Sequence, residues 1–266
     1  MTTPASISSI GEFLEVVRDL PSTLGRSWVF RGVGDANYPF ALLPSVARFR
    51  PRKRAGRKRG SRVANERDIL ERFWREGLPY LRACAPEIAT AARHEGAEQG
   101  ESPITRARFP LEIIALAQHF GVPTRMLDWT RNPLCALFFA VTTYEPAEGA
   151  VYATIPLPQK REGNIELNNH HELFYYSPPH VDQRIAAQAG LLSVHPYDKK
   201  RGRWTTVDET RSNPIALVRT ASKKDLEDEL LSLNIGHAMM FPGLSGLAQN
   251  LRRRFCEGLN AKDGTS

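Results

Sequence analysis

The chain has 266 residues, of which 41% are hydrophobic and 24% are charged, a composition typical of a globular protein large enough to bury a sizeable core. Its three cysteines lie far apart and match no disulfide framework or zinc-ligand spacing, which favours a reducing compartment. The N-terminal stretch lacks the basic start and apolar centre of a secretory signal, and no apolar run is long enough to cross a bilayer, so we expect a cytoplasmic protein that does not bind membranes.

The formal net charge of +7 is concentrated in one segment. Residues 50–62, RPRKRAGRKRGSR, contain eight basic residues and no acidic one, so the remainder of the chain is close to neutral. Such a run repels itself and has no large apolar side chain, which predicts a mobile loop. It is a solvated loop, a contact for RNA or DNA phosphates, or a contact for another anionic surface. Because the run holds no aromatic residue, a nucleic-acid contact there would lack base stacking. The candidate nucleic-acid contacts are Arg52, Lys53, Arg54, Arg57, Lys58 and Arg59.

The pattern of apolar residues predicts helices and strands in irregular order. In chain order, we expect a helix at 7–19, a strand at 28–30, a helix at 63–85, a loop at 94–110, a helix at 111–121, a bend at 122–130, a helix at 132–144, strands at 149–157 and 214–221, and helices at 222–235 and 243–255. Ser9 and Glu12 have the spacing of a capping box in the first helix, and Gly121 suits the residue after a helix end. Because no regular βαβ alternation appears, the sequence favours an α+β fold, with a mixed, largely antiparallel sheet flanked by helices.

Arg31 follows the apolar strand at 28–30, and Gly32 stands beside it. A buried arginine is costly unless it meets an anion, and its forked guanidinium suits a carboxylate or a phosphate. Two interpretations follow. Arg31 forms a structural salt bridge, for instance with Asp35 or Asp128, or it binds an anionic ligand.

The stretch 118–140 places polar residues between two apolar helices, as at a cleft near helix ends. Thr130 or Asn132 is positioned to cap the following helix and leave its first N–H groups facing an anion. Trp129 is suited to form a wall for a flat ring. Alternatively, Asp128 and Thr130 are turn and cap residues and Trp129 belongs to the core. The candidate binding residues here are His119, Thr124, Arg125, Asp128, Trp129 and Asn132.

The stretch 182–194, DQRIAAQAGLLSV, predicts a short helix that stops at Gly190 before a strand, with Gln188 near the junction. The tripeptide His170–Glu172 is similar to a pair of metal ligands, but no third ligand follows at a recognised spacing. We therefore expect no metal site, although a metal-dependent hydrolase that uses His119 and Asp128 remains an alternative.

Taken together, these blocks resemble the FRG domain family in their order. The blocks are FRG at 30–32, LLPSVAR at 42–48, AQHFGVPTRMLDWTRNPLCALFFAV at 117–141, QRIAAQAG at 183–190 and GHAMMFPGLSGLAQNL at 236–251. The resemblance covers roughly residues 10–250. It implies a single FRG domain at 1–258, with the basic loop 50–62 inserted, and a disordered tail at 259–266. It also implies a setting in bacterial stress, toxin or phage defence.

A weaker resemblance, to ADP-ribosyltransferases of the arginine/serine/glutamate type, implies a mechanism. Those enzymes begin with an aromatic–Arg–Gly strand whose arginine holds the NAD phosphates, which is similar to Phe30, Arg31 and Gly32 here. They continue with a Ser-Thr-Ser strand and a helix that reads A-x-x-F-A, which is similar to 128–130 and 136–140. The resemblance therefore implies an ADP-ribosyltransferase-like core with NAD as substrate.

On that resemblance, the catalytic residues are Arg31 at the pyrophosphate, Thr130 at the nicotinamide end, and Gln188 at the place of a catalytic glutamate. A glutamine amide cannot stabilise positive charge as a carboxylate does, and the spacing singles out neither Glu172 nor Asp182 as a substitute. Besides the metal-dependent hydrolase, two functions stay open. One is an ADP-ribosyltransferase-like enzyme acting on nucleic acid or protein, and the other is a non-catalytic module that binds a nucleotide or a nucleic acid.

Overall fold

The computed structural model describes residues 4–21, 27–48, 62–84, 108–142, 147–156, 159–160, 163–178, 183–209 and 215–263. Some residues singled out in the sequence lie outside these ranges. They are Arg52, Lys53, Arg54, Arg57, Lys58 and Arg59 of the basic segment, and Asp182.

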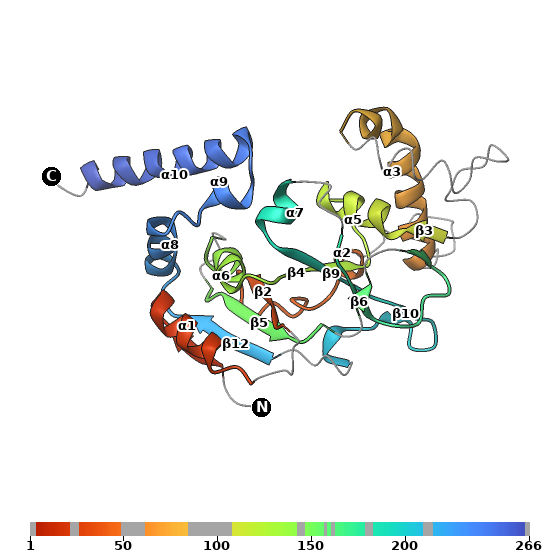
Figure 1. Ribbon diagram of the computed structural model, residues 1–266, viewed down its shortest axis with the longest axis horizontal. Helices are drawn as coiled ribbons and strands as arrows, with labels where there is room; N and C mark the ends of the chain where they lie inside the picture. The colour runs from red at the N-terminus through yellow and green to blue at the C-terminus, as the bar shows by residue number, and fades with distance from the viewer. Residues whose placement is uncertain are drawn as a thin grey trace, which may run out of the picture.

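A mixed sheet forms the centre of the described molecule, with the strand order β1-β12-β5-β2-β4-β9-β8-β6 (Figure 1). Its strands are β1 (Ala5–Ile7), β2 (Val29–Val33), β4 (Met126–Thr130), β5 (Ala150–Thr154), β6 (Gln159–Lys160), β8 (Phe174–Tyr176), β9 (Gly190–Val194) and β12 (Ile215–Thr220). β1 is parallel to β12 and β6 to β8, whereas the other neighbouring pairs are antiparallel. Two separate ribbons pair β3 (Arg108–Pro110) with β7 (Asn164–Glu166) and β10 (Tyr197–Asp198) with β11 (Arg203–Trp204).

Helices flank this sheet, which confirms the expected single-domain α+β architecture. They are α1 (Ile10–Arg18), α2 (Ser45–Arg48), α3 (Arg62–Cys84), α5 (Leu111–His119), α6 (Pro133–Val141), α7 (Gln183–Ala187), α8 (Lys223–Ser232), α9 (His237–Met240) and α10 (Leu244–Asp263), with a short 3-10 turn η2 (Val207–Glu209). In Figure 1, α1 and α8 lie on the side of β12 and β5, α3 and α5 lie toward the other end, and α10 extends away from the body. Within the described ranges, no helix combines the length and the apolar character that crossing a bilayer requires.

Two apolar clusters hold the helices on the sheet. One cluster packs α1, α6 and α8 against β2, β5 and β12, and its centre includes Phe13, Phe30 and Phe138. The other packs α3 and α5 against β4, β8 and β9, around Phe109 and Phe174. β2 belongs to the first cluster and β4 to the second, and these neighbouring strands lie at the middle of the sheet.

Local chemistry fixes several helix ends as the sequence predicts. Ser9 Oγ accepts a hydrogen bond from the Glu12 N–H and caps α1, while the Glu12 carboxylate returns to the N–H of Ser8 at 2.7 Å. Gly121 follows the end of α5 with φ of +82°, a left-handed conformation that favours glycine. The Asn132 side chain caps α6 by accepting from the Leu134 N–H at 3.0 Å.

Two expectations about elements need correction. The expected bend at 122–130 contains β4, a central strand whose Leu127 and Trp129 are buried on one face. The sequence hid this strand because the exposed Asp128 stands among apolar residues. At the other end of the chain, α10 continues to Asp263 and so includes most of the segment 259–266 for which disorder was expected, since no proline interrupts its helical sequence.

The glycine beside Arg31 is required by the packing of α6. A Cβ atom on Gly32 would collide with the backbone carbonyl oxygen of Ala136 and would come within 2.8 Å of the Ala140 nitrogen. The strand β2 and the helix α6 therefore meet backbone to backbone. Gly149, just before β5, meets the Ala140 carbonyl in the same way.

We expect Gly32→Ala to lower the free energy of unfolding by about 3 kcal/mol or more, because backbone atoms cannot rotate out of the way as a side chain can. Urea denaturation followed by circular dichroism measures the loss. The matched control is Gly77→Ala in α3, where the nearest neighbour of an added Cβ is a leucine methyl at 3.9 Å, and alanine there should be neutral or stabilising by up to about 1 kcal/mol. Equal effects of the two substitutions would show that α6 does not press on β2.

Candidate functional site

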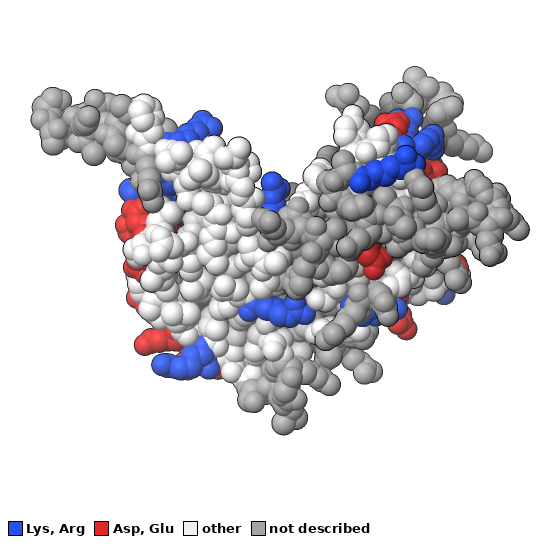
Figure 2. Space-filling view, turned by 45° about the horizontal axis from the view of Figure 1, so that its top comes forward, with Lys and Arg blue, Asp and Glu red and all other residues white. Residues whose placement is uncertain are grey.

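A cavity of about 490 Å³ opens where β2 and β4 diverge. These two strands pair only at Phe30 and Thr130. Beyond that point β2 stays in register with β5, whereas β4 stays in register with β9. The walls of the cavity come from β2, β4, α6, the end of α5, the segment 34–48, the α7 region and Phe241. Figure 2 shows the same molecule hollowed by a notch between the α10 side and the α3 side.

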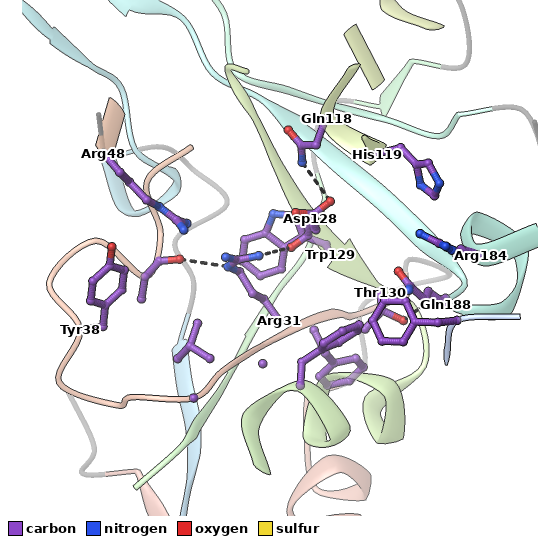
Figure 3. Close-up of a pocket in the computed structure, with 17 residues that line it drawn as sticks. Arg31, Tyr38, Arg48, Gln118, His119, Asp128, Trp129, Thr130, Arg184 and Gln188 are labelled. Carbon is purple, nitrogen blue, oxygen red and sulfur yellow. Dashed lines mark hydrogen bonds between the residues drawn. The ribbon is translucent and has the colours of Figure 1, made fainter. Parts of the chain in front are cut away.

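Arg31 lies at the centre of this cavity and bridges the two diverging strands (Figure 3). Its Nε–H donates to the carbonyl oxygen of Ala41 at 3.0 Å, and its Nη1 donates to the carbonyl oxygen of Asp128 at 2.8 Å. Among the described residues, no carboxylate oxygen forms an ion pair with it, so the expected salt bridge to Asp35 or Asp128 is absent there. The partners of this cation are backbone dipoles.

Burial lowers the pKa of Arg31 to about 10, an effect that the nearby Asp128 carboxylate opposes and the Arg48 guanidinium adds to. The side chain therefore stays protonated at neutral pH, but its charge is poorly solvated. A guanidinium carries more N–H donors than the two that Ala41 and Asp128 receive. Arg31 is thus prepared to bind an anion.

Asp128 is held by the end of α5. The Gln118 Nε2 donates to Asp128 Oδ1 at 2.9 Å, and Gln118 Oε1 in turn accepts from the Thr124 hydroxyl. Both Gln118 and Asp128 border the cavity, whereas Thr124 is fully buried and does not. Thr124, expected to bind a cofactor, therefore acts at a distance by orienting Gln118.

Trp129 belongs both to the core and to the cavity wall. Its Nε1–H donates to Ser193 Oγ at 3.0 Å, Ser193 Oγ lies 2.8 Å from His195 Nε2, and His195 Nδ1 lies 2.8 Å from the Thr205 carbonyl oxygen. Because a carbonyl oxygen can only accept, His195 carries its proton on Nδ1 and donates it to Thr205. The unprotonated Nε2 then accepts a hydrogen bond from the Ser193 hydroxyl. Burial lowers the pKa of His195 to about 4, which keeps this buried chain of hydrogen bonds neutral.

Thr130 connects β4 to the segment that follows α7. Its hydroxyl donates to the Gln188 carbonyl oxygen at 2.6 Å and accepts from the Asn132 N–H at 3.0 Å. The Gln188 side chain donates from Nε2 to the Met240 carbonyl oxygen at 2.9 Å. Thr130 and Gln188 both line the cavity with Arg31, whereas Asn132 is spent on capping α6 and lies outside the lining.

Residues 26–149 match the model of the FRG domain. The chain contains an FRG domain. No curated protein and no solved structure matches the chain. The matched range holds β2, β4, α5 and α6, and with them Arg31 and Asp128. It leaves out Arg184, Gln188 and Phe241, which complete the cavity.

Within the FRG domain, Arg125 was expected to bind a cofactor, but it lies outside the lining of the cavity and is paired inside the fold. Its guanidinium is fully buried and pairs with Glu66 of α3, with Nη2 to Oε2 at 2.7 Å. It also donates to the Leu167 carbonyl oxygen at 3.0 Å and stacks on the ring of Trp204 at 5.2 Å. Because all of these partners lie away from the cavity, Arg125 fastens α3 to the sheet.

The histidines singled out in the sequence lie in different places. His119 borders the cavity with Asp128. His170 lies 3.4 Å from Arg125 Nη1, and burial, aided by that charge, lowers its pKa to about 3. Among the described residues, no three His, Cys, Asp or Glu side chains gather into a possible metal site, and Glu172 is exposed outside the cavity lining.

Several residues that line the cavity were not among the candidate site residues chosen from the sequence. Arg48 stacks over the ring of Tyr38 at 5.8 Å, and Arg184 over the ring of Phe241 at 5.9 Å. In Figure 3, Arg31 lies between Arg48 and Tyr38 on one side and Arg184 on the other. Both arginines stand in the otherwise mostly apolar blocks LLPSVAR and QRIAAQAG, a signal of the same kind that marked Arg31. The aromatic partners carry no comparable signal, because apolar rings also fill cores.

Replacing Glu66 by glutamine should destabilise the protein by about 3–5 kcal/mol, because it leaves a buried guanidinium without its counter-charge. Urea denaturation measures this loss. The control is Glu71→Gln on the same helix, which breaks a half-buried pair with Arg67 at 2.7 Å and should cost less than about 1 kcal/mol. A small effect at both positions would mean that the Arg125 pair is not the anchor of α3.

The neutral His195 should make the fold sensitive to acid. Because its pKa is about 4 in the folded protein and near 6.5 when exposed, the unfolded chain binds the additional proton between these values. Stability should therefore be full above about pH 6.5 and fall toward pH 4, by up to about 1.4 kcal/mol per pH unit from this residue. His195→Gln should lower the slope of the unfolding free energy by up to about 1.4 kcal/mol per pH unit between about pH 4 and 6.5, and His170, whose pKa of about 3 acts in the same direction, keeps the remaining slope. A profile that keeps its slope in His195→Gln would contradict the assignment.

Proposed function

We propose that the cavity of this FRG domain binds NAD, with the diphosphate on the Arg31 guanidinium, and that the protein is an ADP-ribosyltransferase-like enzyme. The observation that carries the proposal is the state of Arg31. It is a half-buried cation in an open cavity, and its protein partners are the carbonyl oxygens of Ala41 and Asp128. A phosphate oxygen would supply the missing counter-charge through charge-assisted hydrogen bonds.

The charge of the cavity wall supports an anionic ligand. The guanidinium groups of Arg31, Arg48 and Arg184 line it, against the single carboxylate of Asp128 among the described lining residues. Such an excess of cations in a concave site attracts phosphates over a distance. The diphosphate of a dinucleotide fits this balance better than a neutral metabolite.

The shape of the wall supports a ligand with flat rings. The aromatic side chains of the lining are Phe30, Tyr38, Trp129, Phe139 and Phe241. Aromatic rings offer flat surfaces on which a base or a pyridine ring stacks. The volume of about 490 Å³ lies within the range of small-molecule sites.

The convergence of three distant segments supports the resemblance to ADP-ribosyltransferases. Arg31, Thr130 and Gln188 line one cavity, and a hydrogen bond of 2.6 Å joins Thr130 to the backbone of Gln188. In the proposed reaction the bond between the nicotinamide nitrogen and the ribose breaks, and an acceptor on a nucleic acid or a protein takes the ADP-ribose. A role in bacterial toxin action or phage defence belongs to the same proposal.

A second candidate function is a non-catalytic module that binds a nucleotide or a nucleic acid. It is favoured by Gln188, an amide whose Nε2 already donates to the Met240 carbonyl oxygen. Incubation with labelled NAD and a panel of RNA, DNA and protein acceptors separates the two candidates. Release of nicotinamide supports the enzyme, whereas salt-sensitive retention of RNA or DNA without release supports the module.

Arg31→Ala should weaken NAD binding by about 100-fold or more, since the loss of a charged donor to a phosphate is worth about 2.7 kcal/mol or more. Isothermal calorimetry measures the affinity. Arg31→Lys should restore only part of it, because an ammonium lacks the planar fork. Arg18→Ala, which removes a highly exposed arginine from α1, is the control and should bind NAD as the wild type does.

Thermal unfolding of each variant separates loss of the ligand contact from loss of the fold. A folded Arg31→Ala protein that binds NAD with unchanged affinity would remove the phosphate-binding role of Arg31.

A further inference from the structure

A second, smaller cavity adjoins the first behind Asp128. It measures about 70 Å³ and shares with the large cavity the residues Gln118, His119, Asp128, Trp129 and Gln188. The rest of its described lining consists of Ala115, Pro178, Gly190, Leu191 and Leu192. The large cavity is therefore rich in cations, the residues that line the small cavity alone are apolar, and the shared residues form the boundary between the two.

Asp128 stands on this boundary and is the only carboxylate among the described residues that line either cavity. Its Oδ1 is held by Gln118 Nε2 at 2.9 Å (Figure 3), and its side chain is exposed rather than buried. The backbone carbonyl of the same residue accepts from Arg31 Nη1. Asp128 therefore contacts Arg31, the proposed diphosphate-binding residue, through its backbone carbonyl, and its side chain brings a negative charge to the same place.

We propose that Asp128 is the catalytic carboxylate of the reaction and that the small apolar cavity receives the leaving nicotinamide ring. This inference rests on the proposed function. A dinucleotide whose diphosphate contacts Arg31 and whose pyridine ring enters the apolar compartment places its ribose at the boundary. The bond that breaks then faces the Asp128 carboxylate.

The reaction balances with these groups alone. The bond between ribose C1′ and the pyridinium nitrogen breaks, and its electron pair leaves with nicotinamide as a neutral molecule. The positive charge that develops on C1′ and the ring oxygen is stabilised by the Asp128 carboxylate. A nucleophile on the acceptor, or water, adds to C1′, and its proton passes to that carboxylate and then to solvent.

Gln188 does not replace Asp128 in this role. Its amide is neutral and its Nε2 is engaged by the Met240 carbonyl oxygen, so it offers no charge to an oxocarbenium-like centre. It remains suited to accept a hydrogen bond from a ribose hydroxyl. In the transferases, the third motif supplies the catalytic glutamate. In this protein Gln188 stands at that place, and the catalytic carboxylate would come instead from Asp128 in the second motif.

The first experiment compares Asp128→Asn with the wild type. Asparagine keeps an oxygen for Gln118 but carries no charge. We expect nicotinamide release at saturating NAD to fall by about 100-fold or more, while the affinity for NAD by calorimetry is retained. Asp128→Glu should recover part of the activity, and Asp68→Asn on the exposed side of α3 is the control with unchanged activity.

The second experiment tests the small cavity. Ala115→Leu adds bulk to its wall and should weaken binding of NAD more than binding of ADP-ribose, which lacks the pyridine ring. The affinities of both ligands are measured by calorimetry on protein whose thermal unfolding is intact. Equal weakening of the two ligands would overturn the placement of the ring.

The outcomes separate this inference from the proposed function. A wild-type protein that does not bind NAD ends both. A wild type that binds NAD but releases no nicotinamide with any acceptor overturns the role of Asp128 and leaves the binding module. Release that is equally fast in Asp128→Asn overturns the role of Asp128 alone, and loss of NAD binding in that variant assigns it to ligand positioning instead of catalysis.

Discussion

The divergence of β2 from β4 is the constraint on which the rest of the structure depends. Gly32 presses β2 against the backbone of α6, and β2 keeps its register with β5, while β4 follows β9. The two strands therefore share one pairing position, at Phe30 and Thr130. Arg31 reaches across the opening to the Asp128 carbonyl and takes the place of a backbone bond. Arg31, the residue proposed to bind the ligand, therefore also links two strands of the sheet.

This double role explains the unusual electrostatics of the cavity. Dipoles of carbonyl groups keep the half-buried Arg31 in place without neutralising it, whereas the fully buried Arg125 has a full counter-charge in Glu66. Two arginines of one domain therefore have opposite uses. The pairing of Arg125 stabilises the packing of α3, and the incomplete pairing of Arg31 leaves electrostatic energy that a bound anion would gain.

The sequence predicted the elements whose signals are local and missed those that depend on distant partners. Ser9, Asn132 and Gly121 mark helix ends through their own backbone contacts, and the order of motifs indicated the family. The sequence also indicated that Arg31 and the segment around Asp128 belong to one site. It did not separate Arg31 from Arg125, because the partner of Arg125 lies 59 positions earlier in the chain. β4 was missed because a central strand that borders a cavity carries polar residues where a strand in a closed core carries apolar ones.

The cavity wall has two origins along the chain. The segment that matches the FRG domain supplies Arg31 and Asp128, and the segment beyond residue 149 supplies Arg184, Gln188 and Phe241. The first segment is constrained by backbone packing at Gly32, whereas α7 and α9 are short helices at the rim. Substitutions in α7 or near Phe241 would therefore alter the outer wall of the cavity, while the inner wall with Arg31 and Asp128 stays intact.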